Sequence, residues 1–299
     1  MSASVKLWWE AARPKTLWAA VSPVLIGISL AVYYGAFHPL SAILALLGAI
    51  LIQIGTNFYN DLSDFKKGAD TPDRKGPRRM VQAGLVSERK MKVATYVTFL
   101  LAVLSGVYLM MRGGMPIVVI GFSSILFGLA YTGGRYSLAY LGIADIFVLV
   151  FFGPVAVAGT FYVQAIEWPL LVWVVGLSPG LLAVSILLVN NIRDRIQDEK
   201  AGKNTLVVRL GRPFGEFLYL MCGLVAGLIP IIVWKWLEAP PSVLIALLAW
   251  PLMIWSWTGL RRIPDDQSAR MNPILGDTAR NLLVFSLLLS VGWLAGVWI

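Results

Sequence analysis

The chain has 299 residues, of which 58% are hydrophobic and only 14% are charged. This balance excludes an ordinary water-soluble globular protein, because runs of about twenty apolar residues, each long enough to cross a bilayer, recur along the whole length. The net charge of +9 comes from basic residues divided among loops, which argues against a nucleic-acid-binding face. A single histidine, His38, and a single cysteine, Cys222, exclude multi-histidine and cysteine metal sites and internal disulfides.

The apolar pattern predicts an all-α polytopic membrane protein that forms one domain over residues 1–299. The first fifteen residues mix Trp8 and Trp9 with charged side chains, which is typical of an interfacial helix rather than a cleavable signal. Nine spanning helices are then expected. They cover residues 16–37, 39–60, 91–111, 114–132, 139–163, 168–191, 213–234, 240–260 and 279–299.

The distribution of basic residues predicts the topology, because lysine and arginine concentrate on the cytoplasmic side of membrane proteins. With nine spans and the N-terminus inside, every lysine and arginine except Arg112 and Lys235 falls on the cytoplasmic side. We therefore expect a multi-pass protein of the inner, cytoplasmic membrane, with a cytoplasmic N-terminus and an external C-terminus. The basic loops also suit anionic lipid headgroups or a phosphorylated substrate.

Two clusters of amides and acids end the second and sixth predicted helices, both on the cytoplasmic side. The clusters consist of Asn57, Asn60, Asp61 and Asp64, and of Asn190, Asn191, Asp194 and Asp198. Separations of three or four residues place each cluster on one helix face. Their recurrence four helices apart indicates an internal four-helix repeat that brings the two clusters together.

Carboxylate and amide oxygens suit a hard cation such as Mg²⁺. Helix capping by asparagine together with solvated acids would explain one such cluster, but two matching clusters favour a metal site. The expected metal ligands are Asp61, Asp64, Asp194 and Asp198.

A basic loop follows the first cluster. It contains Arg74, Lys75, Arg78 and Arg79 around the turn-forming pair Gly76 and Pro77. Cations on a stiff loop beside acids fit a combined magnesium and diphosphate site, although cytoplasmic retention of the loop would also explain its charge. We expect active-site loops over about residues 61–90 and 192–212.

Four segments resemble the UbiA-type intramembrane prenyltransferase superfamily. The sequences NDLSDFKKGAD, from Asn60, and NNIRDRIQDEKAGKNTL, from Asn190, resemble its two aspartate-rich motifs. Residues 12–17 before the first helix and 131–135 after the fourth match in the same order, so the resemblance covers nearly the whole chain. Within the superfamily, GADTPDRKGPRRMVQAGLVS and YTGGRYSLAYLGIADIFVLVFFGPVAVAGT most resemble the branch that prenylates 1,4-dihydroxy-2-naphthoate.

The resemblance implies a UbiA-like helical bundle and a Mg²⁺-dependent transfer reaction. A polyprenyl group would pass from polyprenyl diphosphate to 1,4-dihydroxy-2-naphthoate with loss of CO₂ and diphosphate, giving demethylmenaquinol for menaquinone biosynthesis. Catalytic roles fall by position on Asn60, Asp61, Asp64, Asp194 and Asp198. The loop charges and the resemblance together give the expected diphosphate contacts, which are Asn57, Arg74, Arg78, Arg79, Tyr131, Arg135, Asn191 and Lys203. Arg135 stands where many members have lysine, and no general base is identified.

Two alternatives stay open. One is a UbiA-type enzyme with another aromatic acceptor, such as 4-hydroxybenzoate, homogentisate or a chlorin ring. The other is a cation-coupled secondary transporter, although transporter sites lie near the midplane in broken helices, whereas these acids lie at one membrane edge. Glycines and prolines within the predicted helices leave room for a lipid tunnel but do not identify its walls.

Overall fold

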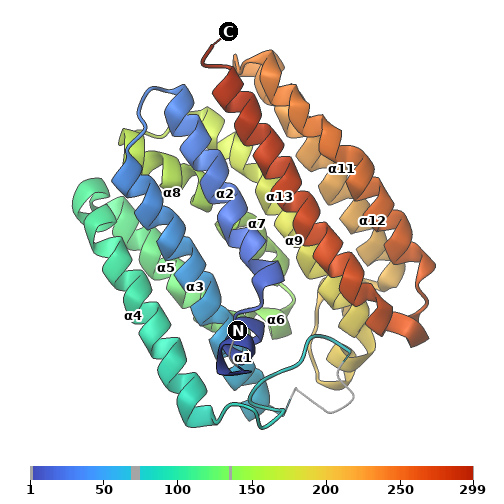
Figure 1. Ribbon diagram of the computed structural model, residues 1–299. Helices are drawn as coiled ribbons and strands as arrows, with labels where there is room; N and C mark the ends of the chain where they lie inside the picture. The colour runs from blue at the N-terminus through green and yellow to red at the C-terminus, as the bar shows by residue number, and fades with distance from the viewer. Residues whose placement is uncertain (1–2, 69–74, 135–136, 299) are drawn as a thin grey trace.

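The computed structural model describes residues 3–68, 75–134 and 137–298, and over these ranges it is a bundle of helices without strands. The long helices run side by side, with the N-terminal helix at one end of the bundle and the C-terminus at the other (Figure 1). Within the described ranges, nine helical segments are long and apolar enough to cross a membrane. The predicted number of spans and the all-α membrane class are confirmed.

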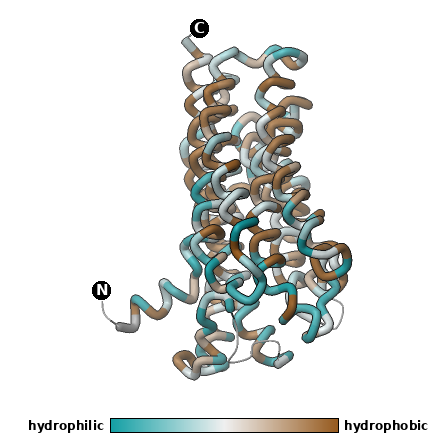
Figure 2. Tube along the Cα trace, turned by 90° about the vertical axis from the view of Figure 1, so that its right-hand side faces the viewer, coloured by the Kyte–Doolittle hydropathy of each residue, from teal (hydrophilic) through white to brown (hydrophobic). Residues whose placement is uncertain are grey.

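The helices follow one another in a simple order. They are α1 (Ala3–Ala12), α2 (Pro14–Tyr33), α3 (Pro39–Lys66), α4 (Glu88–Gly113), α5 (Met115–Thr132), α6 (Leu138–Leu141), α7 (Ala144–Phe151), α8 (Pro154–Ala165), α9 (Leu170–Lys200), α10 (Leu206–Leu210), α11 (Arg212–Trp236), η1 (Pro241–Ala249), α12 (Trp250–Arg262), η2 (Asp265–Arg270) and α13 (Met271–Ala295). Helix α1 lies outside the bundle, close to the end where hydrophilic residues gather (Figure 2). Its position agrees with the expected interfacial helix.

Two helices run further than predicted, and this places the acids on helices. Helix α3 ends at Lys66 rather than at residue 60, and α9 ends at Lys200 rather than at residue 191. Charged side chains mark the membrane boundary but do not stop a helix. The two helices end instead just before glycines with left-handed backbone, Gly68 with φ 65° and Gly202 with φ 72°. At about 1.5 Å per residue, α3 is roughly 42 Å long, longer than the bilayer core of about 30 Å.

The fifth predicted span, 139–163, is wrong as one continuous helix, because the chain is divided there into α6, α7 and α8. The break between α7 and α8 falls at Gly153, just before Pro154. A Cβ atom on Gly153 would lie 2.7 Å from the Gly176 carbonyl oxygen and 2.8 Å from the Gly180 Cα. The broken span therefore packs directly against the backbone of α9, as only glycine permits.

The last two spans also differ from the prediction. The eighth begins as a 3₁₀ segment, η1, and continues as α12, while α13 covers Met271–Ala295 rather than residues 279–299. Helix α13 thus includes a polar first part, which the apolar pattern used to place the span did not mark. Helix α9 is the central element and contacts α2, α7, α8, α11 and α13.

Candidate functional site

The first acidic cluster holds the following loop against the end of α3. Asp61 is only 2% exposed and accepts hydrogen bonds from the backbone N–H groups of Met80 (2.8 Å) and Val81 (3.1 Å). Asp64, also 2% exposed, forms a 2.5 Å ion pair with Arg79. These contacts use one acceptor position on each Asp61 oxygen, so its role as a metal ligand stays a prediction.

Asn60 connects the same helix end to the end of α5. Its side-chain oxygen accepts a 2.6 Å hydrogen bond from the Thr132 hydroxyl, and the neighbouring Ser63 hydroxyl donates to the Thr132 carbonyl at 3.0 Å. Both residues of this contact are buried. The amide oxygen of Asn60 is therefore held in a fixed orientation at the inner face of α3.

The second cluster, on α9, is paired in a similar way. Both carboxylate oxygens of Asp194 accept from the buried Arg193 guanidinium, at 2.8 and 2.6 Å. One turn further on, Asp198 forms a 3.2 Å ion pair with Lys203. Asn191 is buried at 8% exposure on the same stretch of helix. Both clusters lie on helices, and Asp64, Asp194 and Asp198 each have a cationic neighbour.

Two lysines join the two clusters. Lys203, which pairs with Asp198, and Lys67, one turn beyond Asp64, lie 5.7 and 4.6 Å from the centre of the same Tyr140 ring. Lys67 also donates to the Thr132 carbonyl at 2.5 Å and the Ser137 hydroxyl at 3.3 Å. Lys67 is not among the predicted site residues, although its offset of three residues from Asp64 places the two on one helix face.

Charges from both helix ends act on the two lysines. Burial pulls the pKa of Lys203 down, but the charges of Asp198 and Asp64 outweigh it, so the pKa is raised. Burial lowers the pKa of the Lys67 ammonium; the charge of Asp64 offsets part of this effect and the charge of Lys203 adds to it. A carboxylate from each cluster therefore acts on one shared group of lysines.

The other predicted diphosphate contacts lie in different surroundings. Arg79 is buried against Asp64 and Tyr131 lines a cavity, whereas Arg78 is exposed. Asn57 lies one turn further into the membrane, where its side-chain amide donates to the Ala12 carbonyl at 2.9 Å. Arg74 and Arg135 lie outside the described residues.

A side chain from the last helix ties the basic loop to the second cluster. Arg193 donates to the side-chain oxygen of Asn272 at 2.9 Å, and the Asn272 amide donates to the Lys75 carbonyl at 2.8 Å. One asparagine thus contacts both the helix that carries Asp194 and the loop that carries Arg79. Its role could not be found from the sequence, since nothing in the chain near residue 272 resembles a motif.

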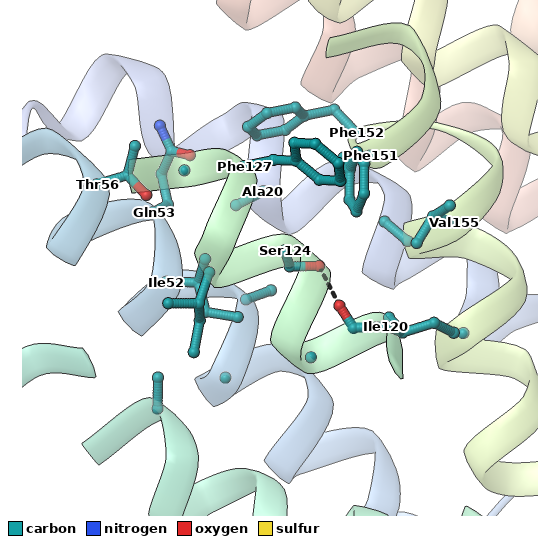
Figure 3. Close-up of a pocket in the computed structure, with 18 of the residues that line it drawn as sticks. Ala20, Ile52, Gln53, Thr56, Ile120, Ser124, Phe127, Phe151, Phe152 and Val155 are labelled. Atoms are coloured by element: carbon teal, nitrogen blue, oxygen red, sulfur yellow. Dashed lines mark hydrogen bonds between the residues drawn. The ribbon is translucent and has the colours of Figure 1, made fainter. Parts of the chain in front are cut away.

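A cavity of about 740 Å³ begins beside these polar groups and extends between the helices. Its polar end is formed by Arg13, Thr16, Asn57, Asn60, Tyr131 and Asn190. Further in, Phe127, Phe151 and Phe152 gather on one side, and the Ser124 hydroxyl is turned to the Ile120 carbonyl of its own helix, at 2.7 Å (Figure 3). The cavity continues to Met110, near the C-terminal end of α4, and to Ile117, near the N-terminal end of α5. Both residues are far from the polar end of the cavity.

The donor chemistry of the helix ends fits a magnesium ion that shares its ligands with a phosphate. In the described part of the chain, no three histidine, cysteine, aspartate or glutamate side chains form a ready cluster for a metal. Mg²⁺ is commonly bound by only one or two carboxylates together with waters and substrate phosphates. Asp64 and Asp198, which act on the same lysine from two helix ends, supply carboxylates of that kind.

A comparison with protein families shows which family this chain belongs to. Residues 20–287 match the model of the UbiA prenyltransferase family. The chain belongs to the UbiA prenyltransferase family. Curated members of this family include the 1,4-dihydroxy-2-naphthoate octaprenyltransferase of Escherichia coli (strain K12), which is 36% identical over 97% of this chain and 96% of its own length. The protein of the same name from Mycobacterium tuberculosis is 36% identical over 95% and 96%.

Solved structures of UbiA proteins share the fold. A UbiA homolog from Archaeoglobus fulgidus, bound to GPP and Mg²⁺, has a TM-score of 0.65 at 16% identity and covers 98% of this chain and 100% of its own. A UbiA homolog from Aeropyrum pernix K1 has a TM-score of 0.63 at 15% identity over 91% and 97%. The UbiA-like helical bundle expected from the sequence is confirmed.

Proposed function

We propose that this UbiA protein transfers a polyprenyl group from its diphosphate to 1,4-dihydroxy-2-naphthoate, with loss of CO₂ and diphosphate, giving demethylmenaquinol. The observation that carries this function is the cavity that joins an apolar interior to the charged helix ends. Its volume of about 740 Å³ lies in the range of about 300–1,000 Å³ usual for small-molecule sites. Relatives that match nearly the whole chain are named for the same reaction.

The cations beside the polar end of the cavity suit the departure of a diphosphate. Arg79, Lys67 and Lys203 would neutralise the negative charge that grows on the leaving group as the allylic C–O bond breaks. The apolar walls beyond them keep water away from the allylic cation, so that the aromatic ring is the nucleophile that meets it. Tyr131 and Asn60 stand at the junction between these two environments.

The proposed reaction also uses a magnesium ion. Asp64 and Asp198, with Asp61 and Asp194 as further candidates, would hold the ion, and it would supply positive charge to the diphosphate oxygens. The surrounding residues keep their separate tasks: Asp61 and Asn272 hold the basic loop, and Asn60 lines the cavity beside them while its amide oxygen accepts from Thr132. The loops over residues 61–90 and 192–212 together form the proposed active-site region.

The charge distribution supports an orientation in the membrane. The hydrophilic residues gather at the end of the bundle that holds α1 and the acidic clusters (Figure 2). We place this end in the cytoplasm, since it carries the basic loops, and the C-terminus on the outer side of the inner membrane. Reporter fusions test this topology: a phosphatase fused after residue 299 should be active, whereas one fused within the 200–205 loop should be inactive.

The deciding experiment is transfer by purified protein. Protein in detergent or nanodiscs is incubated with a polyprenyl diphosphate and a mixture of 1,4-dihydroxy-2-naphthoate, 4-hydroxybenzoate and homogentisate, with and without Mg²⁺. Mass spectrometry should find a prenylated naphthoquinol that has lost the carboxylate, formed only with the metal. Prenylation of a different acceptor in preference would refute the acceptor assignment, and ion flux without release of diphosphate would refute prenyl transfer altogether.

A further inference from the structure

The turn between α1 and α2 has a strained backbone. Arg13 adopts φ 53° and ψ 68°, in the left-handed region that residues with a side chain seldom occupy. Such conformations cost of order 1–3 kcal/mol and persist where surrounding contacts impose them. Glycine would relieve the strain at no steric cost, so the presence of arginine indicates that its side chain is used.

Side chains from α3 impose this conformation. The Asn57 amide donates to the Ala12 carbonyl at 2.9 Å and to the Thr16 hydroxyl at 3.1 Å, and the Thr16 hydroxyl donates in turn to the Arg13 carbonyl at 2.9 Å. The turn is therefore held on both sides of Arg13. Asn57, which we expected to contact diphosphate, holds this turn in the structure.

Arg13 lines the cavity. Over the described residues, it is the one charged residue in the cavity wall. Its charge acts on Tyr131, which lines the same end of the cavity. The lysines and Arg79 that face Asp64 and Asp198 lie outside this wall. Among the described residues, Arg13 is thus the cation that lines the cavity itself.

We propose that Arg13 binds the carboxylate of the aromatic acceptor, and so selects a carboxylated ring and orients it in the cavity. A carboxylate cannot enter an apolar cavity without a compensating charge, and a guanidinium matches its two oxygens with paired hydrogen bonds. Holding that group fixes the carbon that bears it, which is the carbon where the prenyl group is attached in the proposed reaction. The inference rests on the proposed function and assigns its acceptor subsite.

Steady-state kinetics of Arg13→Gln test this subsite. Loss of charge-assisted hydrogen bonds should raise the KM for 1,4-dihydroxy-2-naphthoate on the order of 10- to 100-fold and leave the KM for the prenyl diphosphate unchanged. The preference over 1,4-dihydroxynaphthalene, which has the same ring without the carboxylate, should disappear. Arg13→Lys should restore part of it. Lys15→Gln is the matched control, because Lys15 is exposed on the same turn and does not line the cavity.

A rise in the KM for the diphosphate alone, or an unchanged acceptor preference, would overturn the inference. Binding to wild-type protein gives a second test that depends on no variant: 1-hydroxy-2-naphthoate should bind more tightly than 1-naphthol, and equal binding would also overturn it. This measurement separates the two proposals. If wild-type protein does not prenylate 1,4-dihydroxy-2-naphthoate, the proposed function fails, while the preference for the carboxylated naphthol still decides the role of Arg13.

Discussion

Asp61→Ala should release the basic loop from the end of α3. The buried carboxylate accepts two backbone hydrogen bonds, from Met80 at 2.8 Å and Val81 at 3.1 Å. Hydrogen bonds to a charged group contribute about 1.5–3 kcal/mol each, so the two stabilise the docked loop by roughly 3–6 kcal/mol if they add. Since about 1.4 kcal/mol corresponds to a factor of ten, the detached population should rise at least on the order of 100-fold.

Trypsin can measure this release. Arg79 is 5% exposed in the docked loop, while Arg78 beside it is exposed. Cleavage after Arg79 should therefore be slow in the wild type and fast in Asp61→Ala, because proteolysis follows the population of the open form when opening is rapid. Cleavage after Arg78 provides the internal reference. Mass spectrometry of the fragments distinguishes the two bonds.

Asp198→Asn is the matched control for this experiment. It removes an acid of the second cluster, which pairs with Lys203, and leaves the contacts of Asp61 and Asp64 with the loop in place, so the bond after Arg79 should stay protected while prenyl transfer is lost. Equal protection of that bond in Asp61→Ala and the wild type would refute the argument that Asp61 holds the loop. The Asp61 carboxylate would then act only at the metal and diphosphate site.

Three further outcomes follow from the structure. Asp194→Ala should abolish prenyl transfer without changing the elution volume, whereas wild-type turnover would remove Asp194 from the site. Asn272→Ala should loosen the basic loop from Arg193 and so lower kcat. The expected loss is roughly tenfold, for hydrogen bonds of about 1–2 kcal/mol, and the KM for the acceptor should stay unchanged. Gln267→Ala, which changes an exposed residue nearby, is the control. Gly180→Leu should destabilise the bundle by about 1–3 kcal/mol or more, because a Cβ there would lie 3.0 Å from the Gly153 Cα, and an unchanged thermal midpoint would contradict this packing.

The parts of the molecule that follow from the sequence are those with a repeating physical signal. Apolar runs gave nine spans, and the three- and four-residue spacing placed Asp61 with Asp64 and Asp194 with Asp198 on helix faces. The ends of α3 and α9 were misplaced, because the sequence marks where the membrane stops and the helix stops later, at Gly68 and Gly202.

The contacts of the site were harder to predict, for two physical reasons. Asp61 binds backbone N–H groups, and every residue except proline carries such a donor, so no side-chain type marks Met80 and Val81 as its partners. The cavity walls come from several helices, and Phe127 or Phe151 would have the same hydrophobicity if it faced lipid. Arg13 lies within a segment that resembles the family, but the sequence could not show that it lines a cavity.

The paired charges at the helix ends also bear on how substitutions there should be interpreted. Asp64 pairs with Arg79, and Asp198 pairs with Lys203. A magnesium diphosphate brings both signs of charge, so its binding would exchange each internal pair for two new ones: carboxylate with metal, and cation with phosphate. Substituting one member leaves its neighbour in a largely buried place without the matching charge, and the measured loss then includes that penalty. A double-mutant cycle across Asp198 and Lys203 separates the two contributions, because the pair removed together leaves no uncompensated charge.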